Sequence, residues 1–190
     1  MIAIIDYQMA NLRSVEKAFL KVGGRAVVTS DKNKIMKAKR LVLPGVGAFG
    51  YGMRELQKGG FVRIIKDAVA EGKPFFGVCL GMQLLFEKSD EAPGVKGLGL
   101  LKGDVKRFSP RLKLKVPHMG WNQITPDGSY VYFVHSYYCA PKDKSIITAT
   151  TYYGINFASM IKKGNIYGCQ FHPEKSQDAG LKIVENFVRL

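Results

Sequence analysis

The segment 73–86, KPFFGVCLGMQLLF, places a cysteine between two glycines where an apolar run ends and helical spacing begins. Residues 75–78 have the pattern of a buried strand, and the apolar residues after the cysteine recur at helical intervals: Met82, Leu85 and Phe86. Because Gly77 and Gly81 lack Cβ, a strand and a helix can cross closely there. The segment therefore predicts a strand, a sharp strained turn at Cys79, and a helix that ends near residue 89.

A cysteine in such a turn has the position of a nucleophile. The unpaired N–H groups and the dipole at the start of the next helix favour the thiolate, which is the reactive form. The alternative is that Cys79 is a small buried apolar residue, which is the usual role of a free cysteine. The two flanking glycines and the change of periodicity favour the nucleophile.

The first third of the chain alternates short apolar strands, at 2–5, 26–29 and 41–43, with amphipathic helical segments. This alternation predicts an α/β fold in three layers, a mostly parallel sheet with helices on both faces, and ligands at the carboxyl ends of its strands. From residue 94 onward β-rich runs predict a mixed or antiparallel extension of the sheet; they are 104–108, 121–124, 130–138 and 146–153. A length of 190 residues predicts one domain, 1–190.

The N-terminal segment lacks the basic region and cleavage site of a signal peptide, and no apolar run reaches membrane-spanning length. The three cysteines are odd in number and form no C-x-x-C pair. This usage fits a reducing compartment and not a disulfide framework. We therefore expect a cytoplasmic protein with no membrane association.

The net charge of +14 is carried in part by two basic runs, 31–40 and 102–115. A basic face can bind nucleic acid, attract an anion or meet an acidic protein, and it can also be simply a solvated surface. The sequence contains no aromatic-interleaved RNA-binding motif and no zinc finger. We expect no nucleic-acid partner, and an acidic partner protein is favoured.

A glycine-rich loop, PGVGAFG at 44–50, follows the third predicted strand. The phosphate-binding patterns G-x-x-x-x-G-K-[ST] and G-x-G-x-x-G are absent from it. The loop can supply an oxyanion hole, with one N–H from Leu80 and a second from Val46 or Gly47. Its alternative interpretation is a plain tight turn.

The last predicted strand leads into His172, Pro173 and Glu174. In extended chain, residues two apart project to the same side, so the carboxylate can bind one imidazole nitrogen and leave the other free. A nucleophilic thiol needs such a base, and the base needs an acceptor that fixes its tautomer. We expect Cys79, His172 and Glu174 to form a triad, and Ser176 to cap the final helix.

Two other interpretations involve the same residue types. Zinc could bind through Cys169 and His172, or through His135 and Cys139, but neither spacing is that of a paired ligand motif, so we expect no metal and no cofactor. The segment PHMGWN at 117–122 holds the only tryptophan. It predicts a functional surface loop, with a packed tryptophan as the alternative.

Segments GVCLGMQ at 77–83 and HPE at 172–174 resemble the triad-type glutamine amidotransferases, which release ammonia from glutamine through a γ-glutamyl thioester. Further segments are similar to the glutaminase subunits of the histidine-pathway branch of that family: Tyr7 with NLRS at 11–14, LPGVGAF at 43–49, PHMGWN, HSYY at 135–138 and HPEKS at 172–176. The resemblance extends from the first strand to the last helix.

The resemblance implies that Cys79 attacks the glutamine amide carbon, that His172 protonates the departing ammonia and activates water, and that Glu174 orients His172. It also implies a set of substrate and oxyanion positions: Gly45, Val46, Gly47, Leu80, Gln83, Ser136 and Tyr137. In this family the ammonia passes to a (β/α)8-barrel cyclase subunit that makes imidazole glycerol phosphate. Here that subunit would be a separate chain in a heterodimer, and three residues match its interface: Asn11, Trp121 and Lys175.

Gln8 and Ala10 occupy positions at which the family usually has glycine. A positive φ at such a position costs glutamine more than glycine. Two alternatives to the glutaminase stay open. One is another acyl-transfer hydrolase of the same fold, such as a peptidase or γ-glutamyl hydrolase, and the other is a basic nucleic-acid-binding module with a vestigial triad.

Overall fold

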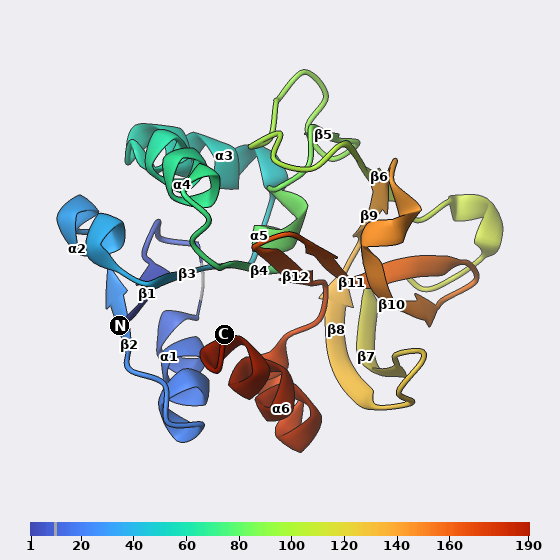
Figure 1. Ribbon diagram of the computed structural model, residues 1–190. Helices are drawn as coiled ribbons and strands as arrows, with labels where there is room; N and C mark the ends of the chain where they lie inside the picture. The colour runs from blue at the N-terminus through green and yellow to red at the C-terminus, as the bar shows by residue number, and fades with distance from the viewer. Residues whose placement is uncertain (10) are drawn as a thin grey trace.

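A computed structural model describes residues 1–9 and 11–190, so the expectation at Ala10 lies outside the described residues. Its main element is a seven-stranded sheet in the order β10-β11-β12-β4-β3-β1-β2 (Figure 1). Five strands are parallel: β1 (Ile2–Ile5), β2 (Ala26–Thr29), β3 (Arg40–Gly45), β4 (Phe75–Cys79) and β12 (Ile166–Cys169). β10 (Ile147–Tyr152) and β11 (Asn156–Lys163) extend the sheet as antiparallel strands. The predicted fold class is confirmed.

Helices cover both faces of this sheet (Figure 1). One side carries α1 (Leu12–Lys21) and α6 (Gln177–Val188), and the other carries α2 (Lys32–Lys37), α3 (Phe49–Lys58) and α4 (Phe61–Ala70). Neighbouring residues of β1 point to opposite faces, so Ile4 packs with Phe19 and Phe187 in one core while Ile5 packs with Leu56 in the other. The sheet therefore has one hydrophobic core on each face. None of the described helices is long and apolar enough to cross a membrane.

Most of the β-rich runs between residues 94 and 141 form two small sheets beside the main one. One contains β5 (Lys88–Ser89), β6 (Gly103–Arg107) and β9 (Tyr137–Pro141), and the other pairs β7 (His118–Gln123) with β8 (Tyr130–His135). The run 130–138, expected as one strand, is divided at Ser136 between the two sheets. The extension of the main sheet comes from β10 and β11, which occupy the edge beside β12.

The helix after Cys79 is shorter than predicted, since α5 spans only Leu80–Gln83. The expectation that it continues to residue 89 was wrong. The carbonyls of Leu84 and Leu85 accept hydrogen bonds from the N–H groups of Leu98 and Leu101, at 2.8 and 3.0 Å. Because these carbonyls are engaged by a distant segment, they do not continue the helix. Short 3₁₀ turns lie elsewhere: Pro110–Leu112, Lys144–Ile146 and Pro173–Lys175.

Candidate active site

Cys79 ends β4 with φ 54° and ψ −111°, a conformation that L-residues rarely adopt and that costs about 1–3 kcal/mol. Close approach of strand and helix holds it there. A Cβ on Gly81 would lie 1.8 Å from the Leu43 carbonyl oxygen, and one on Gly77 would lie 2.7 Å from the Gly81 carbonyl oxygen. The strained turn between a strand and a helix is confirmed, and both glycines are sterically required.

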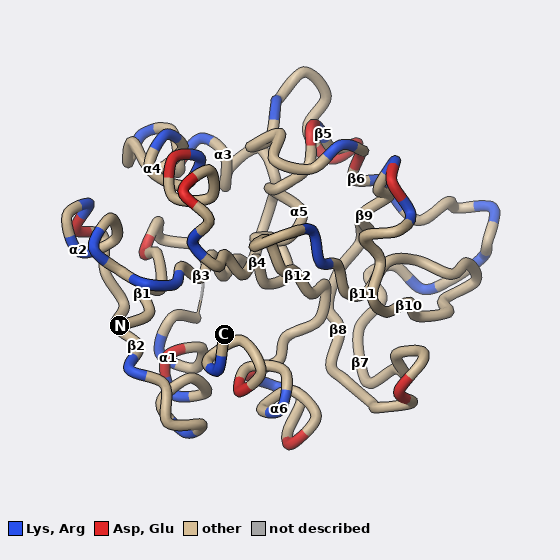
Figure 2. The backbone as a smooth tube through the Cα atoms, in the orientation of Figure 1, with Lys and Arg blue, Asp and Glu red and all other residues tan. Residues whose placement is uncertain are grey.

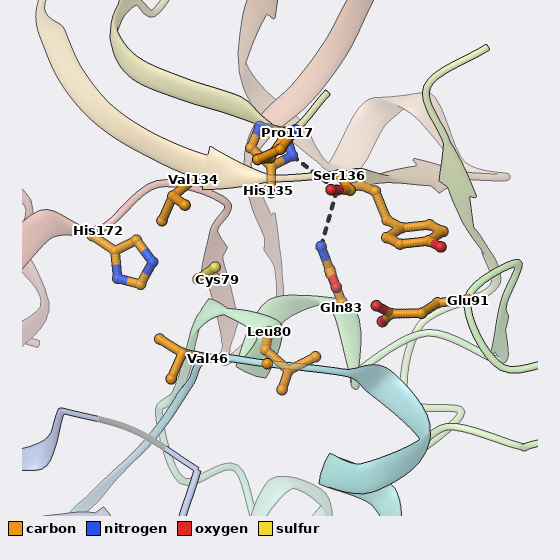
Figure 3. A pocket seen from close by; sticks show the side chains of 12 residues that line it. Val46, Cys79, Leu80, Gln83, Glu91, Pro117, Val134, His135, Ser136 and His172 are labelled. Carbon is orange, nitrogen blue, oxygen red and sulfur yellow. Dashed lines mark hydrogen bonds between the residues drawn. The ribbon is translucent and has the colours of Figure 1, made fainter. Parts of the chain in front are cut away.

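His172 reaches the same sheet edge because β12 lies beside β4 as a parallel strand, with Cys169 opposite Val78. Its Nδ1 is 2.8 Å from Oε1 of Glu174. Its Nε2 has no hydrogen-bond partner among the described residues, and its ring lies beside the Cys79 sulfur (Figure 3). Burial alone would lower the pKa of His172, but its interactions with Cys79 and Glu174 outweigh burial and raise the pKa to about 10. The imidazole is therefore protonated at neutral pH.

Ser176 holds the backbone of the base in place. Its Oγ donates to the His172 carbonyl at 2.6 Å and accepts from the Tyr132 N–H at 2.9 Å. The His172 N–H in turn donates to the Tyr132 carbonyl at 2.9 Å. Ser176 lies at the start of α6 as predicted, but its side chain does not cap the helix, because its Oγ is engaged by the His172 carbonyl and by the Tyr132 N–H of β8.

Cys79 and His172 open onto a cavity of about 250 Å³ (Figure 3). It is lined by Val46, Gly47, Cys79, Leu80, Gln83, Glu91, Pro117, Val134, His135, Ser136, Tyr137 and His172. The substrate positions expected from the sequence, Gln83, Ser136 and Tyr137, are thus brought together with the nucleophile. Glu91 was not identified from the sequence, because nothing in the loop around it forms a pattern. Its Oε2 accepts from the Phe49 N–H at 2.7 Å, and Figure 3 shows the carboxylate beside Gln83.

The glycine-rich loop follows β3, whose Gly45 lies opposite Cys79 in the sheet register. The Val46 N–H donates to the Met9 carbonyl at 2.6 Å, so Val46 is not available as an oxyanion donor in this conformation. Gly47 adopts φ +99°, which favours glycine. Leu80 is the first residue of α5, where an N–H has no acceptor within the helix. The oxyanion roles of Leu80 and Gly47 stay predictions.

The segment 117–122, expected as a loop, is mostly strand β7. Trp121 on this strand is 48% exposed, and its ring lies 6.1 Å from that of Tyr132. The Lys175 ammonium lies 5.8 Å from the centre of the Tyr132 ring. Trp121 and Lys175 therefore form one exposed patch around Tyr132. Asn11, also exposed, lies at the start of α1, where its side chain accepts from the Ser14 N–H at 3.4 Å.

In the first loop Gln8 has φ +66°, a conformation that favours glycine and is strained for glutamine, as the sequence comparison with the family suggested. Its N–H donates to Asp6 Oδ1 at 3.0 Å, which stabilises the turn locally.

Two of the residues considered for zinc, His135 and Cys169, are engaged in hydrogen bonds with backbone carbonyls. His135 Nδ1 lies 2.8 Å from the Tyr137 carbonyl, and the Cys169 thiol lies 3.4 Å from the Phe171 carbonyl. Within residues 1–9 and 11–190, no group of three or more His, Cys, Asp or Glu side chains could hold a metal ion. Lys and Arg are spread over the outer helices and loops instead of gathering on one element (Figure 2).

A cysteine in a strained strand–helix turn beside a buried His–Glu pair, at the carboxyl edge of a parallel sheet, is the arrangement expected of an acyl-transfer enzyme. The family model described as "Glutamine amidotransferase class-I" matches residues 3–190. The chain is 52% identical to the imidazole glycerol phosphate synthase subunit HisH of Geobacter sulfurreducens, with 98% of this chain and 97% of that protein covered. It is 48% identical to subunit HisH 1 of Methanococcus maripaludis over 100% of both chains.

A solved structure described as a glutamine amidotransferase has the same fold, with a TM-score of 0.81 at 19% identity and complete coverage of both chains. The PurLQS structure from Thermotoga maritima superposes with a TM-score of 0.71 at 19% identity, covering 99% of this chain and 96% of that chain. The chain belongs to the class-I glutamine amidotransferases and, within them, to the family of HisH subunits of imidazole glycerol phosphate synthase.

Proposed function

We propose that residues 1–190 form a single glutaminase domain in which Cys79, His172 and Glu174 hydrolyse glutamine, and that the ammonia passes to a separate cyclase subunit. The observation that carries this proposal is the strained Cys79 turn, which faces a cavity beside a histidine held by a buried carboxylate. The family assignment supplies the reaction class.

In the first half of the reaction, the Cys79 thiolate attacks the side-chain amide carbon of glutamine. The carbonyl π electrons move onto oxygen, where the N–H groups of Leu80 and Gly47 stabilise the negative charge. His172 is protonated at neutral pH and gives its Nε2 proton to the leaving nitrogen, so that ammonia departs as the C–N bond breaks. The product on the enzyme is a γ-glutamyl thioester.

In the second half, neutral His172 takes a proton from water as the water attacks the thioester carbon. The C–S bond breaks, and glutamate and the Cys79 thiolate are released while the proton stays on His172. Glu174 accepts from Nδ1 throughout, which keeps Nε2 directed at the reacting atoms.

The cavity wall opposite the sulfur fits the amino-acid end of glutamine. Glu91 supplies a carboxylate for the α-ammonium group, and the Phe49 N–H holds that carboxylate from behind. Gln83, Ser136 and Tyr137 line the space between Glu91 and Cys79. Glutamine therefore lies with its amide at the sulfur and its charged end at Glu91.

The exposed patch of Trp121, Lys175 and Tyr132 is the proposed contact with the cyclase subunit, a (β/α)8 barrel, in a heterodimer. An exposed tryptophan is the kind of anchor that interfaces use. Asn11 lies at the start of α1, which packs beside the turn Pro173–Lys175, and it would extend this contact. The three cysteines are free, which is consistent with the cytoplasmic location that we propose.

The test is a glutamate-release assay on the purified chain, alone and with a candidate cyclase and its nucleotide ligand. We expect the cyclase and ligand to raise the rate, and Cys79→Ala to abolish it while the chain still co-purifies with the cyclase. Undiminished turnover by the alanine variant would defeat the assignment. If a glutamine-analogue electrophile left Cys79 unlabelled, another acyl-transfer activity would be favoured.

A further inference from the structure

A continuous chain of hydrogen bonds runs from the Cys79 sulfur through the protein interior to strand β7. Its members are Gln170, Gln83, the Tyr137 carbonyl, His135, His118 and Asn122. The side chains of Gln170, Gln83, His135 and His118 are buried. Cys79 belongs to the proposed triad, and Gln83 and Tyr137 belong to the expected substrate positions, but Gln170, which contacts the Cys79 sulfur, has neither role.

The direction of every hydrogen bond in the chain follows from one atom, the Tyr137 carbonyl oxygen, because a carbonyl can only accept. Gln83 Nε2 lies 3.0 Å from that oxygen and His135 Nδ1 lies 2.8 Å from it, so both nitrogens donate. Gln83 cannot be turned around, because its Oε1 would then face the carbonyl oxygen.

The same reasoning fixes the orientation of Gln170. Gln83 Nε2 lies 3.1 Å from Gln170 Oε1, so its second hydrogen is donated there. The other end of the Gln170 amide, Nε2, consequently faces the Cys79 sulfur at 3.8 Å. Turning Gln170 around would set two N–H donors against each other and leave both without acceptors inside the protein.

The outer half of the chain holds the Tyr137 carbonyl in place. Because His135 donates from Nδ1, its Nε2 accepts from His118 Nδ1 at 2.9 Å, and His118 Nε2 accepts from Asn122 Nδ2 at 3.1 Å. Burial lowers the pKa of His135 to about 3 and that of His118 to about 4. Both rings are therefore neutral at physiological pH, each in a single tautomer.

Gln170 and His172 approach the sulfur from the same segment. Gln170 follows β12 directly, and its own N–H donates to the Ser159 carbonyl at 2.9 Å, which fixes its backbone. His172 lies two residues further on, and its ring also lies beside the Cys79 sulfur, where β4 ends.

We propose that Gln170 is a further catalytic residue, which donates its side-chain N–H to the Cys79 sulfur and stabilises the thiolate before attack and after thioester breakdown. The proposal rests on the proposed function only in taking Cys79 as the nucleophile. A hydrogen bond to a charged acceptor is about twice as strong as one between neutral groups, so the amide acts on the thiolate more than on the thiol. The other titratable groups near the sulfur are Tyr7, Cys139, Cys169 and His172, and Glu174 binds His172.

The test follows the alkylation of Cys79 by iodoacetamide as a function of pH, read by mass spectrometry of the peptide that carries it. Only the thiolate reacts, and the readout does not require that glutamine is the substrate. Gln170→Glu keeps the shape but replaces the donor by an acceptor, and Gln170→Met removes the donor without adding charge. Gln57→Glu, at an exposed position on α3, is the matched control.

We expect the pH midpoint of alkylation to rise by about one unit in Gln170→Glu and by less in Gln170→Met. The kcat for glutamate release should fall about tenfold or more in both, and the Gln57→Glu control should match the unchanged protein. An unshifted midpoint in Gln170→Met would overturn the proposal even if activity fell. Glutaminase activity in the unchanged protein tests the proposed function separately.

If neither Gln170→Glu nor Gln170→Met folds, a measurement that leaves Gln170 unchanged can still test the proposal. In the ¹⁵N-labelled protein, the Gln170 side-chain amide proton should move when Cys79 is replaced by alanine, because its acceptor is lost. The side-chain amide of Gln57 serves as the reference. A Gln170 resonance that does not respond would contradict the proposed hydrogen bond.

Discussion

The imidazole Nδ1 of His172 lies 2.8 Å from Glu174 Oε1, and both side chains are almost fully buried, at 3% and 4% exposed. In this low-dielectric setting the carboxylate both selects the tautomer and stabilises the imidazolium. Glu174→Gln keeps the shape but loses the charge, so we expect kcat for glutamate release to fall by about 10²- to 10⁴-fold. Steady-state kinetics would measure the fall. A variant within twofold of the unchanged protein would show that Glu174 does not orient the base.

Glu91 is expected to act on binding and not on the chemical step. Glu91→Gln retains an acceptor for the Phe49 N–H but loses the charge that would pair with the α-ammonium of glutamine. We expect KM to rise about tenfold or more, with kcat changed little. Glu185→Gln, on the exposed end of α6, is the matched control. An equal loss in kcat with unchanged KM would place Glu91 elsewhere in the mechanism.

The buried pair His118 and His135 makes stability depend on pH. Their pKa values, lowered by burial to about 4 and about 3, lie below the unfolded value of about 6.5. Between these values the unfolded chain binds more protons, so the free energy of unfolding should fall as the pH drops from about 6.5 toward 4. His172, whose pKa is raised, is protonated in both the folded and the unfolded state over that range, so it does not change the stability there. Above pH 6.5 the folded protein binds this proton more tightly than the unfolded chain, so the free energy of unfolding falls as the pH rises toward 10.

Urea unfolding at pH 7 and pH 5, followed by circular dichroism, would measure the acid-side effect. His135→Gln should be less stable at pH 7 and should show a smaller difference between the two pH values. If the difference were as large in this variant as in the unchanged protein, other groups would account for it.

Trp121 gives a test of the proposed interface. Trp121→Ala removes an exposed ring that lies beside Tyr132 and Lys175, so it should spare the fold and weaken cyclase binding by about tenfold or more. Calorimetric titration with the cyclase would measure the affinity, and labelling of Cys79 by a glutamine analogue would check the site. Tyr51→Ala, at a 43% exposed position on α3, is the control. If Trp121→Ala and Tyr51→Ala bound the cyclase with equal affinity, the face that carries Trp121 would be excluded as the interface.

The sequence predicted the parts of the site that depend on local chemistry. The two glycines and the change of periodicity predicted the strained turn at Cys79, because sterics within a few residues decide it. The predicted His172–Glu174 contact is also present, but the extended chain from which it was predicted is wrong: the contact is made across a 3₁₀ turn, Pro173–Lys175.

What the sequence did not predict depends on contacts between distant segments. The hydrogen bond from the Val46 N–H to the Met9 carbonyl and the early end of α5 each involve a partner that no local pattern specifies. Glu91 and Gln170 are likewise positioned by the packing of separate loops and strands. Strand propensity predicted β6, the end of β7, and β8 and β9 as one run, but not which sheet each joins, because alternation describes a strand's faces and not its neighbours.

The pairing of β4 with β12 brings together Cys79 and His172, which are 93 positions apart in the sequence. During synthesis the segment with Cys79 emerges long before the one with His172, and domains fold as their segments become available. A nascent polypeptide therefore holds the thiol without a proton acceptor or donor beside it. Glutamine in the surrounding solution is consequently not consumed until the ribosome has delivered the final strand.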